Sequence, residues 1–456
     1  MRLLIREVLE ATGGKLIFGD RNQAITGVST DTRTLKRGDL FFALKGERFD
    51  GHAYVRSALK RGAAGVVVEK RGRTGQTRQT RRTEIQVPDT LKALGDLASY
   101  WRYRHPIPVI AITGSNGKTT TKEMLASILS RRYRVLKTEG NLNNQIGVPL
   151  TLFRLRSRHQ MAVLEFGMNH PGEIRRLAEI GAPRYGLITN VGRAHLQGLG
   201  RVRGVARAKG ELIEALPADG VSFLNRDDRF YSFLRDRSLS PVVSFGWGRG
   251  AEVRGGDLRM EGIRSLRFRV SLGGRSVPFS LSATGRHNGT NALAAIAVAD
   301  HLGIPTRSIQ EALTRFHPES SRMEVVKRKK WIVINDAYNA NPDSMARALE
   351  FLAEMGRKEG RRTVAILGDM LELGRHARLA HREVGRKVAD LGIQLLIAIG
   401  PHSREIVKGA CPVGVSPSYH FRKLEEAKAA LPSLLHTGDL ILIKGSRGMQ
   451  MERIKL

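Results

Sequence analysis

A short segment near residue 115 combines the residue types that bind phosphate. The apolar run VIAIT at 109 to 113 leads into GSNGKTT and then into a segment with helical spacing. Backbone N–H groups of a glycine turn and the positive end of a helix attract an anion, and a lysine neutralises its charge. We therefore predict a phosphate loop that binds ATP, with the hydroxyl of Thr119 on Mg2+. Its members are Gly114, Ser115, Asn116, Gly117, Lys118, Thr119 and Thr120.

The spacing within this loop differs from that of the usual phosphate loop. Two residues separate Gly114 from Gly117, where four are usual. A chance glycine turn before a helix is the alternative interpretation. A strand, a lysine, two threonines and a helix in the required order argue against that alternative.

Two further side chains could serve a site of phosphoryl transfer. Glu165 ends the apolar run MAVLE, and His195 lies in the loop after the apolar run YGLIT. Ligands of doubly wound sheets bind at the carboxyl ends of the strands, so both residues could hold magnesium there. Taken alone, Glu165 could equally be a helix-cap carboxylate, and His195 an ordinary loop residue. Lys209 lies in the helical pattern VARAKGELIEAL, and the residues alone predict a solvated surface cation.

The apolar runs that must position these residues divide the chain into three parts. Residues 1–86 carry short strand-like runs, and residues 87–316 repeat a strand and then a helix, as parallel sheets do. Residues 251 to 283 alternate like the strands of a meander. Residues 317–456 carry four more strand-like runs. The expected fold is therefore α/β with three domains: a small N-terminal α/β domain, a central parallel-sheet P-loop ATPase domain and a C-terminal Rossmann-like domain.

Cysteine usage and hydropathy indicate a cellular compartment. The only cysteine, Cys411, cannot form an internal disulfide, and no cluster of cysteine and histidine has zinc-like spacing. No stretch approaches the roughly 20 apolar residues that a membrane span requires, and the N-terminus does not resemble an export signal. We therefore expect a cytoplasmic monomer without a membrane span.

The formal net charge of +33 raises nucleic acid as a rival partner. The arginines are spread along the whole chain, however, and the densest basic run, at 70 to 82, has no interleaved aromatic residues for base stacking. We interpret that run as an exposed loop and expect no specific nucleic-acid partner. The charge can instead steer anionic substrates toward the protein.

Ordered motifs along nearly the whole chain resemble the Mur ligases, the cytoplasmic enzymes that assemble peptidoglycan precursors. The segments GERFDGH, NLNNQIG, DAYNANP and GDMLELG look like the subtype that adds a dipeptide rather than a single amino acid. The matching motifs are STDTR at 29 to 33, ALKGERFDGH at 43 to 52, TGSNGKTTTKEM at 113 to 124, GNLNNQIGVPLTL at 140 to 152, EFGMNHPGEI at 165 to 174, AHLQGLG at 194 to 200, AKGE at 208 to 211, GRHNGTNALAA at 285 to 295, NDAYNANPDSM at 335 to 345, LGDMLELG at 367 to 374 and KGSRGM at 444 to 449.

The resemblance implies an ATP-dependent ligase that works through an acyl-phosphate. It would add D-alanyl-D-alanine to UDP-N-acetylmuramoyl-tripeptide, with ATP and Mg2+, and form the pentapeptide precursor of peptidoglycan. Another ligase of the same superfamily, which adds a single amino acid, is the nearest alternative. A nucleic-acid-binding ATPase is the alternative from a different class.

The resemblance also implies roles for individual residues. Lys209 would be carbamylated and, with Thr119, Glu165 and His195, would hold magnesium. Asn288 and Asn291 would lie near the adenine, and Asp336 would bind the ribose. The catalytic set would be Lys118, Glu165, His195, Lys209 and Arg322. The substrate residues would be Ser29, Thr30, Asp31 and Arg33 in a first domain that binds the UDP-sugar peptide, Asn141, Asn143 and Asn144 in the central domain, and Tyr338, Asn339 and Asn341 in the third domain.

The chain departs from the family pattern at one hinge. Arg322 matches an arginine that reaches across to the ATP phosphates, but the family usually has Pro-Gly before it. Here Ser320 and Ser321 occupy those positions. We therefore expect this hinge to flex differently.

Overall fold

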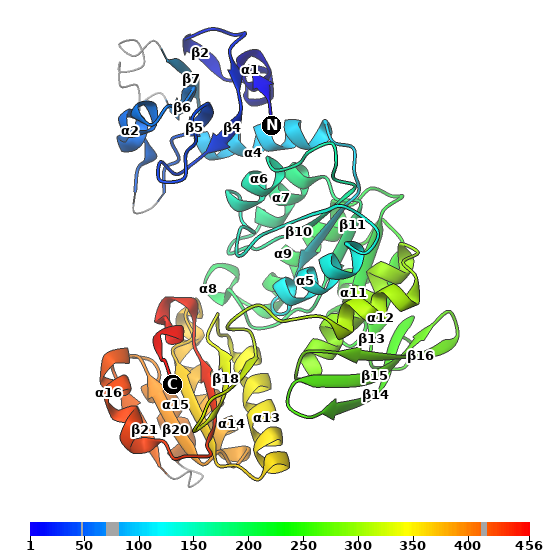
Figure 1. Cartoon of the computed structure of the whole chain (residues 1–456), viewed down its shortest axis with the longest axis vertical. Helices are drawn as coiled ribbons and strands as arrows, with labels where there is room; N and C mark the ends of the chain where they lie inside the picture. The colour runs from blue at the N-terminus through cyan, green and yellow to red at the C-terminus, as the bar shows by residue number, and fades with distance from the viewer. Residues whose placement is uncertain (47–48, 70–81, 412–416) are drawn as a thin grey trace.

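Three separate β-sheets, each with its own helices, make up most of the protein. The computed structural model describes residues 1–46, 49–69, 82–411 and 417–456. Figure 1 shows the N-terminal and C-terminal sheets toward opposite ends of the long axis, with the central sheet between them. Two residues of the motif at 43 to 52 and residues 70–81 of the predicted basic loop lie outside the described residues.

The N-terminal sheet has the order β2-β7-β6-β5-β4, in which only β2 runs antiparallel to its neighbour. Two short strands, β1 (Leu3–Leu4) and β3 (Ala24–Ile25), form a separate antiparallel pair. The apolar runs LFFALK at 40 to 45 and GVVVEK at 65 to 70 overlap two of the buried strands of the five-stranded sheet. The elements are β2 (Lys15–Phe18), β4 (Gly27–Ser29), β5 (Asp39–Phe42), β6 (Gly65–Glu69), β7 (Thr83–Val87), α1 (Ile5–Thr12) and α2 (Val55–Lys60).

The central sheet has nine strands in the order β16-β15-β14-β13-β12-β11-β8-β10-β9. All neighbours from β9 to β14 are parallel, and β14, β15 and β16 are antiparallel, which confirms the predicted meander as one edge of the sheet. The strands are β8 (Val109–Thr113), β9 (Val135–Lys137), β10 (Met161–Glu165), β11 (Tyr185–Ile188), β12 (Val221–Asn225), β13 (Val242–Gly246), β14 (Val253–Glu261), β15 (Ser265–Leu272) and β16 (Arg275–Leu281).

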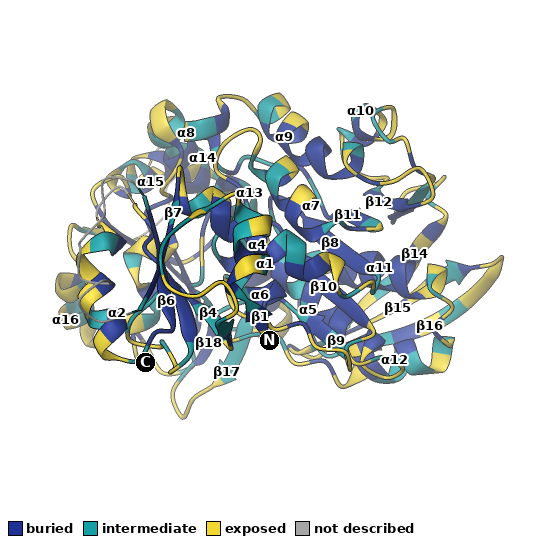
Figure 2. Ribbon diagram, turned by 90° about the horizontal axis from the view of Figure 1, so that it is seen from above, coloured by how far each residue is buried: buried dark blue, intermediate teal, exposed yellow. Residues whose placement is uncertain are grey.

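Helices cover both faces of this sheet, so β8 is buried along its whole length (Figure 2). Helices α4, α7 and α9 pack on one face, and α5, α11 and α12 pack on the other. The helices are α4 (Thr90–Tyr103), α5 (Lys118–Leu129), α6 (Gly147–Leu152), α7 (Glu173–Gly181), α8 (Leu196–Leu199), α9 (Val202–Glu214), α10 (Tyr231–Arg235), α11 (Arg286–His301) and α12 (Thr306–Thr314).

The C-terminal sheet has the order β17-β18-β22-β19-β20-β21, parallel except for β17. The sequence predicted the four inner strands but not β17 and β21. These edge strands contain no fully buried residue, so they have no continuous apolar run. The elements are β17 (Glu324–Lys327), β18 (Ile332–Asp336), β19 (Thr363–Gly368), β20 (Leu395–Ile399), β21 (Ser418–Phe421), β22 (Leu440–Lys444), α13 (Pro342–Glu359), α14 (Ala377–Asp390), α15 (Arg404–Ala410) and α16 (Leu424–Leu434).

The α/β fold class is therefore confirmed. The domain boundaries at residues 86 and 316 stay predictions. Within the described ranges, no helix combines the length and apolarity needed to cross a bilayer.

Candidate active site

The phosphate loop has the predicted local structure. Strand β8 ends at Thr113, and helix α5 begins at Lys118. Gly114 and Gly117 have φ values of 154° and 81°, which side-chain-bearing residues rarely adopt. A Cβ at Gly114 would lie 1.9 Å from Oγ1 of Thr189, and one at Gly117 would lie 2.2 Å from Oδ1 of Asn291. Both glycines are therefore required by conformation and by space.

Two amides of this loop do not have the predicted role. The N–H of Ser115 donates to the carbonyl of Asn190 at 2.9 Å, and the N–H of Asn116 donates to Oδ1 of Asn190 at 3.0 Å. The expectation that the amides from Gly114 to Lys118 all converge on an anion is wrong for these two. Asn190, which follows β11, fixes the loop instead.

Lys118 and Glu165 lie close to each other at the carboxyl ends of neighbouring strands. Nζ of Lys118 donates to the carbonyl of Gly114 at 2.9 Å, and burial lowers its pKa while the nearby Glu165 opposes that shift. The carboxylate of Glu165 accepts a hydrogen bond from Nδ2 of Asn143 at 2.8 Å through Oε1. Its Oε2 is buried and, among the described residues, has no hydrogen-bond partner. A buried carboxylate oxygen without a partner suits a metal ion or another cation.

His195 lies in the same electrostatic environment. Its backbone is left-handed, with φ 55°, at the start of α8. Nδ1 lies 2.8 Å from Oε2 of Glu372, which comes from the C-terminal domain. Burial lowers the pKa of His195, Glu372 opposes the shift, and Lys118 and Lys209 add to it. The imidazole is therefore biased toward its neutral form.

Lys209 is buried, with 1% of its surface exposed, so the prediction of a surface cation is wrong. Helix α9 carries it on the face that packs against the central sheet. Burial and then Lys118 lower its pKa well below the ordinary value. No hydrogen bond or ion pair of Lys209 is found among the described residues. The amine of Lys209 is therefore biased toward its neutral form.

Arg322 reaches the same region from the linker that leads to the C-terminal sheet. Its guanidinium lies 3.7 Å from the ring centroid of Tyr338, and its Nε is buried without a hydrogen-bond partner within the described part of the chain. The positive charge of Arg322 contributes to the lowered pKa of Lys118. The two cations therefore lie within electrostatic range, as residues sharing a polyphosphate would.

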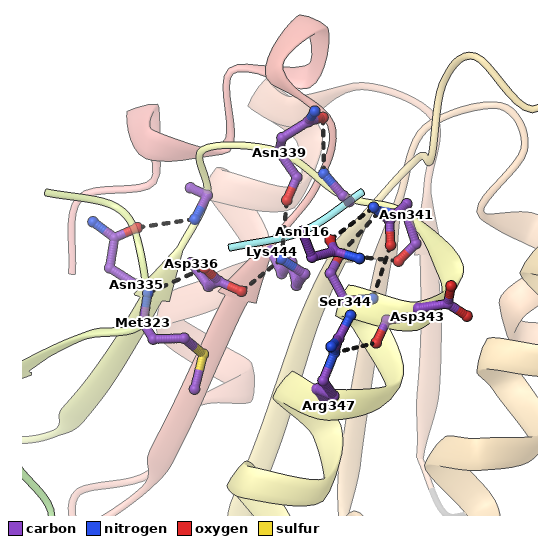
Figure 3. Close-up of polar contacts among 12 residues, drawn as sticks. Asn116, Met323, Asn335, Asp336, Asn339, Asn341, Asp343, Ser344, Arg347 and Lys444 are labelled. Carbon is purple, nitrogen blue, oxygen red and sulfur yellow. Dashed lines mark hydrogen bonds and ion pairs between the residues drawn. The ribbon is translucent and has the colours of Figure 1, made fainter. Parts of the chain in front are cut away.

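Contacts between the central and C-terminal parts close one side of the site. Nδ2 of Asn341 donates to Oδ1 of Asn116 at 2.9 Å, as Figure 3 shows. The N–H of Arg193 donates to Oδ2 of Asp343 at 2.7 Å, and its guanidinium also contacts Oδ1 of Asp343 at 3.0 Å and the carboxylate of Glu383. The phosphate loop is thus tied to the N-terminus of α13.

A cavity of about 1140 Å³ joins these groups. It is large enough for a nucleotide together with a second substrate. Predicted residues that do not line it are Ser29, Thr30, Asp31, Arg33, Gly114, Asn141 and Lys209. Predicted residues that line it are Ser115, Asn116, Gly117, Lys118, Thr119, Thr120, Asn143, Asn144, Glu165, His195, Asn288, Asn291, Arg322, Asp336, Tyr338, Asn339 and Asn341.

The residues outside the cavity have different surroundings. Asp31 and Arg33 form an exposed ion pair with each other at the end of β4 in the N-terminal sheet, at 2.6 Å. The structure does not bring them together with the phosphate loop. Lys209 does not line the cavity, but it lies close enough to help lower the pKa of His195.

Several predicted nucleotide residues already have protein partners. Nδ2 of Asn288 donates to the carbonyl of Thr284 at 2.7 Å, and its Oδ1 accepts from Nδ2 of Asn291 at 3.1 Å. Both oxygens of Asp336 are also engaged, by the N–H of Met323 at 3.1 Å and by Nζ of Lys444 at 2.5 Å (Figure 3). These side chains shape the site, and much of their hydrogen-bonding capacity is used in doing so.

Sequence reasoning missed other residues of the site. Glu372 and Lys444 lie in the motifs LGDMLELG and KGSRGM, so a signal was present for both. Asn190 follows the predicted strand YGLIT, at the strand end where ligands bind. Trp247 also lines the cavity, and no motif or spacing pointed to it.

The residues fit a magnesium site only if other ligands join them. No group of three or more histidine, cysteine, aspartate or glutamate side chains in the described ranges could hold a metal ion. Glu165 supplies one oxygen that has no partner among the described residues, and Thr119, at the start of α5, supplies a hydroxyl to the same cavity. Nucleotide phosphates are hard oxygen donors of the kind that complete magnesium coordination.

Comparison with known proteins gives a consistent result over nearly the whole chain. Three family models match: "Mur ligase family, catalytic domain" at residues 24–102, "Mur ligase middle domain" at 112–299 and "Mur ligase, glutamate ligase domain" at 321–447. Proteins named UDP-N-acetylmuramoyl-tripeptide--D-alanyl-D-alanine ligase from Treponema pallidum and Bacillus subtilis are 38% and 36% identical, over 100% and 99% of this chain and 98% and 97% of theirs.

Solved structures agree with these relatives. A crystal structure of MurF from Acinetobacter baumannii is 34% identical and superposes with a TM-score of 0.90, covering 100% of this chain and 98% of that one. MurF from Thermotoga maritima in complex with ADP is 25% identical, with a TM-score of 0.80 over 94% and 96% of the two chains. The chain belongs to the Mur ligase family.

Proposed function

We propose that this protein is an ATP-dependent ligase that joins D-alanyl-D-alanine to UDP-N-acetylmuramoyl-tripeptide. The observation that carries the proposal is one cavity in which a phosphate loop, a buried carboxylate and a cation from the C-terminal linker meet. Relatives that carry this activity in their names match the chain from end to end. The product is the pentapeptide precursor of peptidoglycan.

The reaction needs activation because a carboxylate does not condense with an amine in water. The terminal carboxylate of the tripeptide attacks the γ-phosphate of ATP and gives an acyl-phosphate and ADP. The positive charges of Lys118 and Arg322 stabilise the negative charge that spreads over the transferred phosphoryl group. The amine of the dipeptide then attacks the acyl carbon, and phosphate leaves as the amide bond forms.

Magnesium, when bound, would neutralise phosphate charge as a Lewis acid. Glu165, Thr119, His195 and a carbamate on Lys209 are the residues we propose to hold it. Oε2 of Glu165, which has no hydrogen-bond partner in the part of the chain that the structure describes, and the lowered pKa of Lys209 support this assignment. Asn143 positions the Glu165 carboxylate through its hydrogen bond.

The resemblance to the Mur ligases supports roles for the remaining substrate residues. We propose that Ser29, Thr30, Asp31 and Arg33 bind the nucleotide end of the UDP-linked precursor and that Asn141, Asn143 and Asn144 line its path. Tyr338, Asn339 and Asn341 form the wall contributed by the C-terminal domain. The precursor would extend from the N-terminal sheet to the cavity, with Asn143 and Asn144 at the cavity end.

Substrate omission tests the proposal directly. Phosphate release is measured with ATP and magnesium while the UDP-linked tripeptide and the dipeptide are left out in turn. We expect release only when both are present, and a single amino acid should not replace the dipeptide. Phosphate release that continues when either substrate is omitted, or that DNA or RNA stimulates, would contradict the proposal. We also expect the protein to be a cytoplasmic monomer. Light scattering of the purified protein checks the mass of the monomer.

A further inference from the structure

We propose that Trp247 is the stacking platform for the purine base of the nucleotide. The inference deepens the proposed function and rests on it, because it names a specificity-determining contact within the nucleotide site. Trp247 follows strand β13, on the side of the cavity where α11 begins. Base stacking on an aromatic ring needs one accessible face and a ring that is held still.

Surrounding residues hold the indole ring in place. Nε1 donates to Oγ1 of Thr290 at 2.9 Å, so the polar atom of the ring is satisfied. Phe268 packs against the ring in a T-shaped arrangement with a centroid separation of 5.9 Å. A Cβ at Gly255 would lie 2.6 Å from the ring, and one at Gly289 would lie 2.9 Å from it. Two glycines in different elements therefore leave the space that this ring fills.

A carboxylate holds the backbone of the same turn. Oδ2 of Asp227 accepts from the N–H of Trp247 at 2.6 Å, and Oδ1 accepts from the N–H of Gly248 at 2.9 Å. The ring is therefore held by its backbone, by its nitrogen and by its packing against Phe268. Its remaining surface lines the cavity.

The alternatives for binding the base are weaker. The carboxamides of Asn288 and Asn291 bond to each other, and that of Asn288 also donates to the carbonyl of Thr284, and neither side chain has a ring on which a purine could stack. The ring of Tyr338 is covered by Arg322 at 3.7 Å, and Phe351 is 97% buried from solvent, with 3% exposed. Trp247 presents a large, partly exposed ring on the α11 side of the described cavity wall.

The order of the residues between the phosphate loop and Trp247 also fits a nucleotide. Asn291 lies against Gly117 of the phosphate loop, and Thr290, the partner of the indole, is its neighbour in α11. A ligand that extends from the phosphate loop along the start of α11 therefore reaches Trp247. Arg286 lies over the ring at 5.5 Å, and because this side chain is exposed it can move aside for the base.

Tryptophan fluorescence tests this inference without any turnover. The chain has three tryptophans, and neither Trp101 nor Trp331 lines the cavity, so the double variant W101F/W331F reports on Trp247 alone. We expect ADP and adenosine to quench its emission and tripolyphosphate, which lacks a base, to leave it unchanged. Quenching by tripolyphosphate equal to that by ADP, or no quenching by ADP, would overturn the inference.

Calorimetry with ADP separates this inference from the proposed function. Trp247→Leu keeps an apolar side chain against Phe268 and should weaken ADP binding about 5- to 150-fold, whereas Trp247→Phe keeps a ring and most of the affinity. Trp331→Leu is the matched control and should bind ADP as the wild type does. If Trp247→Leu binds ADP with unchanged affinity, Trp247 is not the stacking platform, and the ligase proposal is unaffected. Failure of the wild-type protein to bind ADP sinks both.

Discussion

Asn341 donates a hydrogen bond to Asn116 across 225 residues of sequence, from the first turn of α13 to the phosphate loop, at 2.9 Å. The same side chain caps α13 by accepting from the N–H of Ser344 at 2.9 Å. The side chain of Asn341 thus stabilises a helix of the C-terminal domain and also links that domain to the nucleotide site. Loss of the two bonds should have separable effects.

Asn341→Ala and Asn341→Ser separate these effects. Serine still caps the helix but is too short to reach Asn116, so only alanine should lower the free energy of unfolding, by about 1 kcal/mol. Both variants should lose roughly 2- to 10-fold in kcat/KM for ATP, the worth of one hydrogen bond. Urea titration and initial rates measure the two quantities. Wild-type kinetics in Asn341→Ser would show that the contact with Asn116 has no role in catalysis.

Lys209 should make the enzyme depend on carbon dioxide. Its lowered pKa keeps the amine neutral at lower pH than an ordinary lysine, and only the neutral amine forms a carbamate. We expect removal of dissolved carbon dioxide to reduce the rate about 10- to 100-fold and bicarbonate to restore it. Lys209→Met should have the low rate in both buffers. A carbon-13 carbamate signal from labelled bicarbonate should appear in the wild type and be missing from the variant.

His287 should make folding stability depend on acidity. Burial lowers its pKa from 6.5 to about 3, with smaller effects from Arg347 and Lys444. Below pH 6.5 the unfolded chain binds a proton that the folded protein does not, so the free energy of unfolding falls as the pH drops from 6.5 toward 3. Denaturant unfolding of the wild type and His287→Gln at pH 7.5, 5.5 and 4.5 checks this. The variant should lose less stability, and parallel losses would refute the assignment.

Ser321 should be a strained position. It has φ 62°, a backbone conformation that favours glycine, and its hydroxyl accepts from Nδ2 of Asn335 at 3.2 Å. Ser321→Gly removes the strain and should raise the free energy of unfolding by up to about 1 kcal/mol, less the lost hydrogen bond. Ser321→Ala keeps the strain and loses the bond, so it should be less stable than the wild type. Thermal unfolding ranks the three, and a glycine variant less stable than the alanine variant would exclude strain.

Individual residues and strands show which features of the structure a local sequence pattern can predict. The phosphate loop was predictable because a buried strand, two glycines and a helix start are consecutive in sequence, and each has its own signature. Strands β17 and β21 were not predictable, because an edge strand needs no continuous apolar run. The roles of Glu165 and His195 stayed open for a related reason: their types and positions fit more than one use.

The sequence by itself determined the α/β class, the parallel central sheet, the antiparallel meander at its edge and the family. These follow from hydrophobic periodicity and from ordered motifs, which are properties of neighbouring residues. Only the tertiary structure decided that Lys209 is buried, that Asn190 takes two of the loop amides and that Trp247 lines the cavity. Burial and pKa depend on which distant segments pack around a side chain, and sequence neighbours do not encode that.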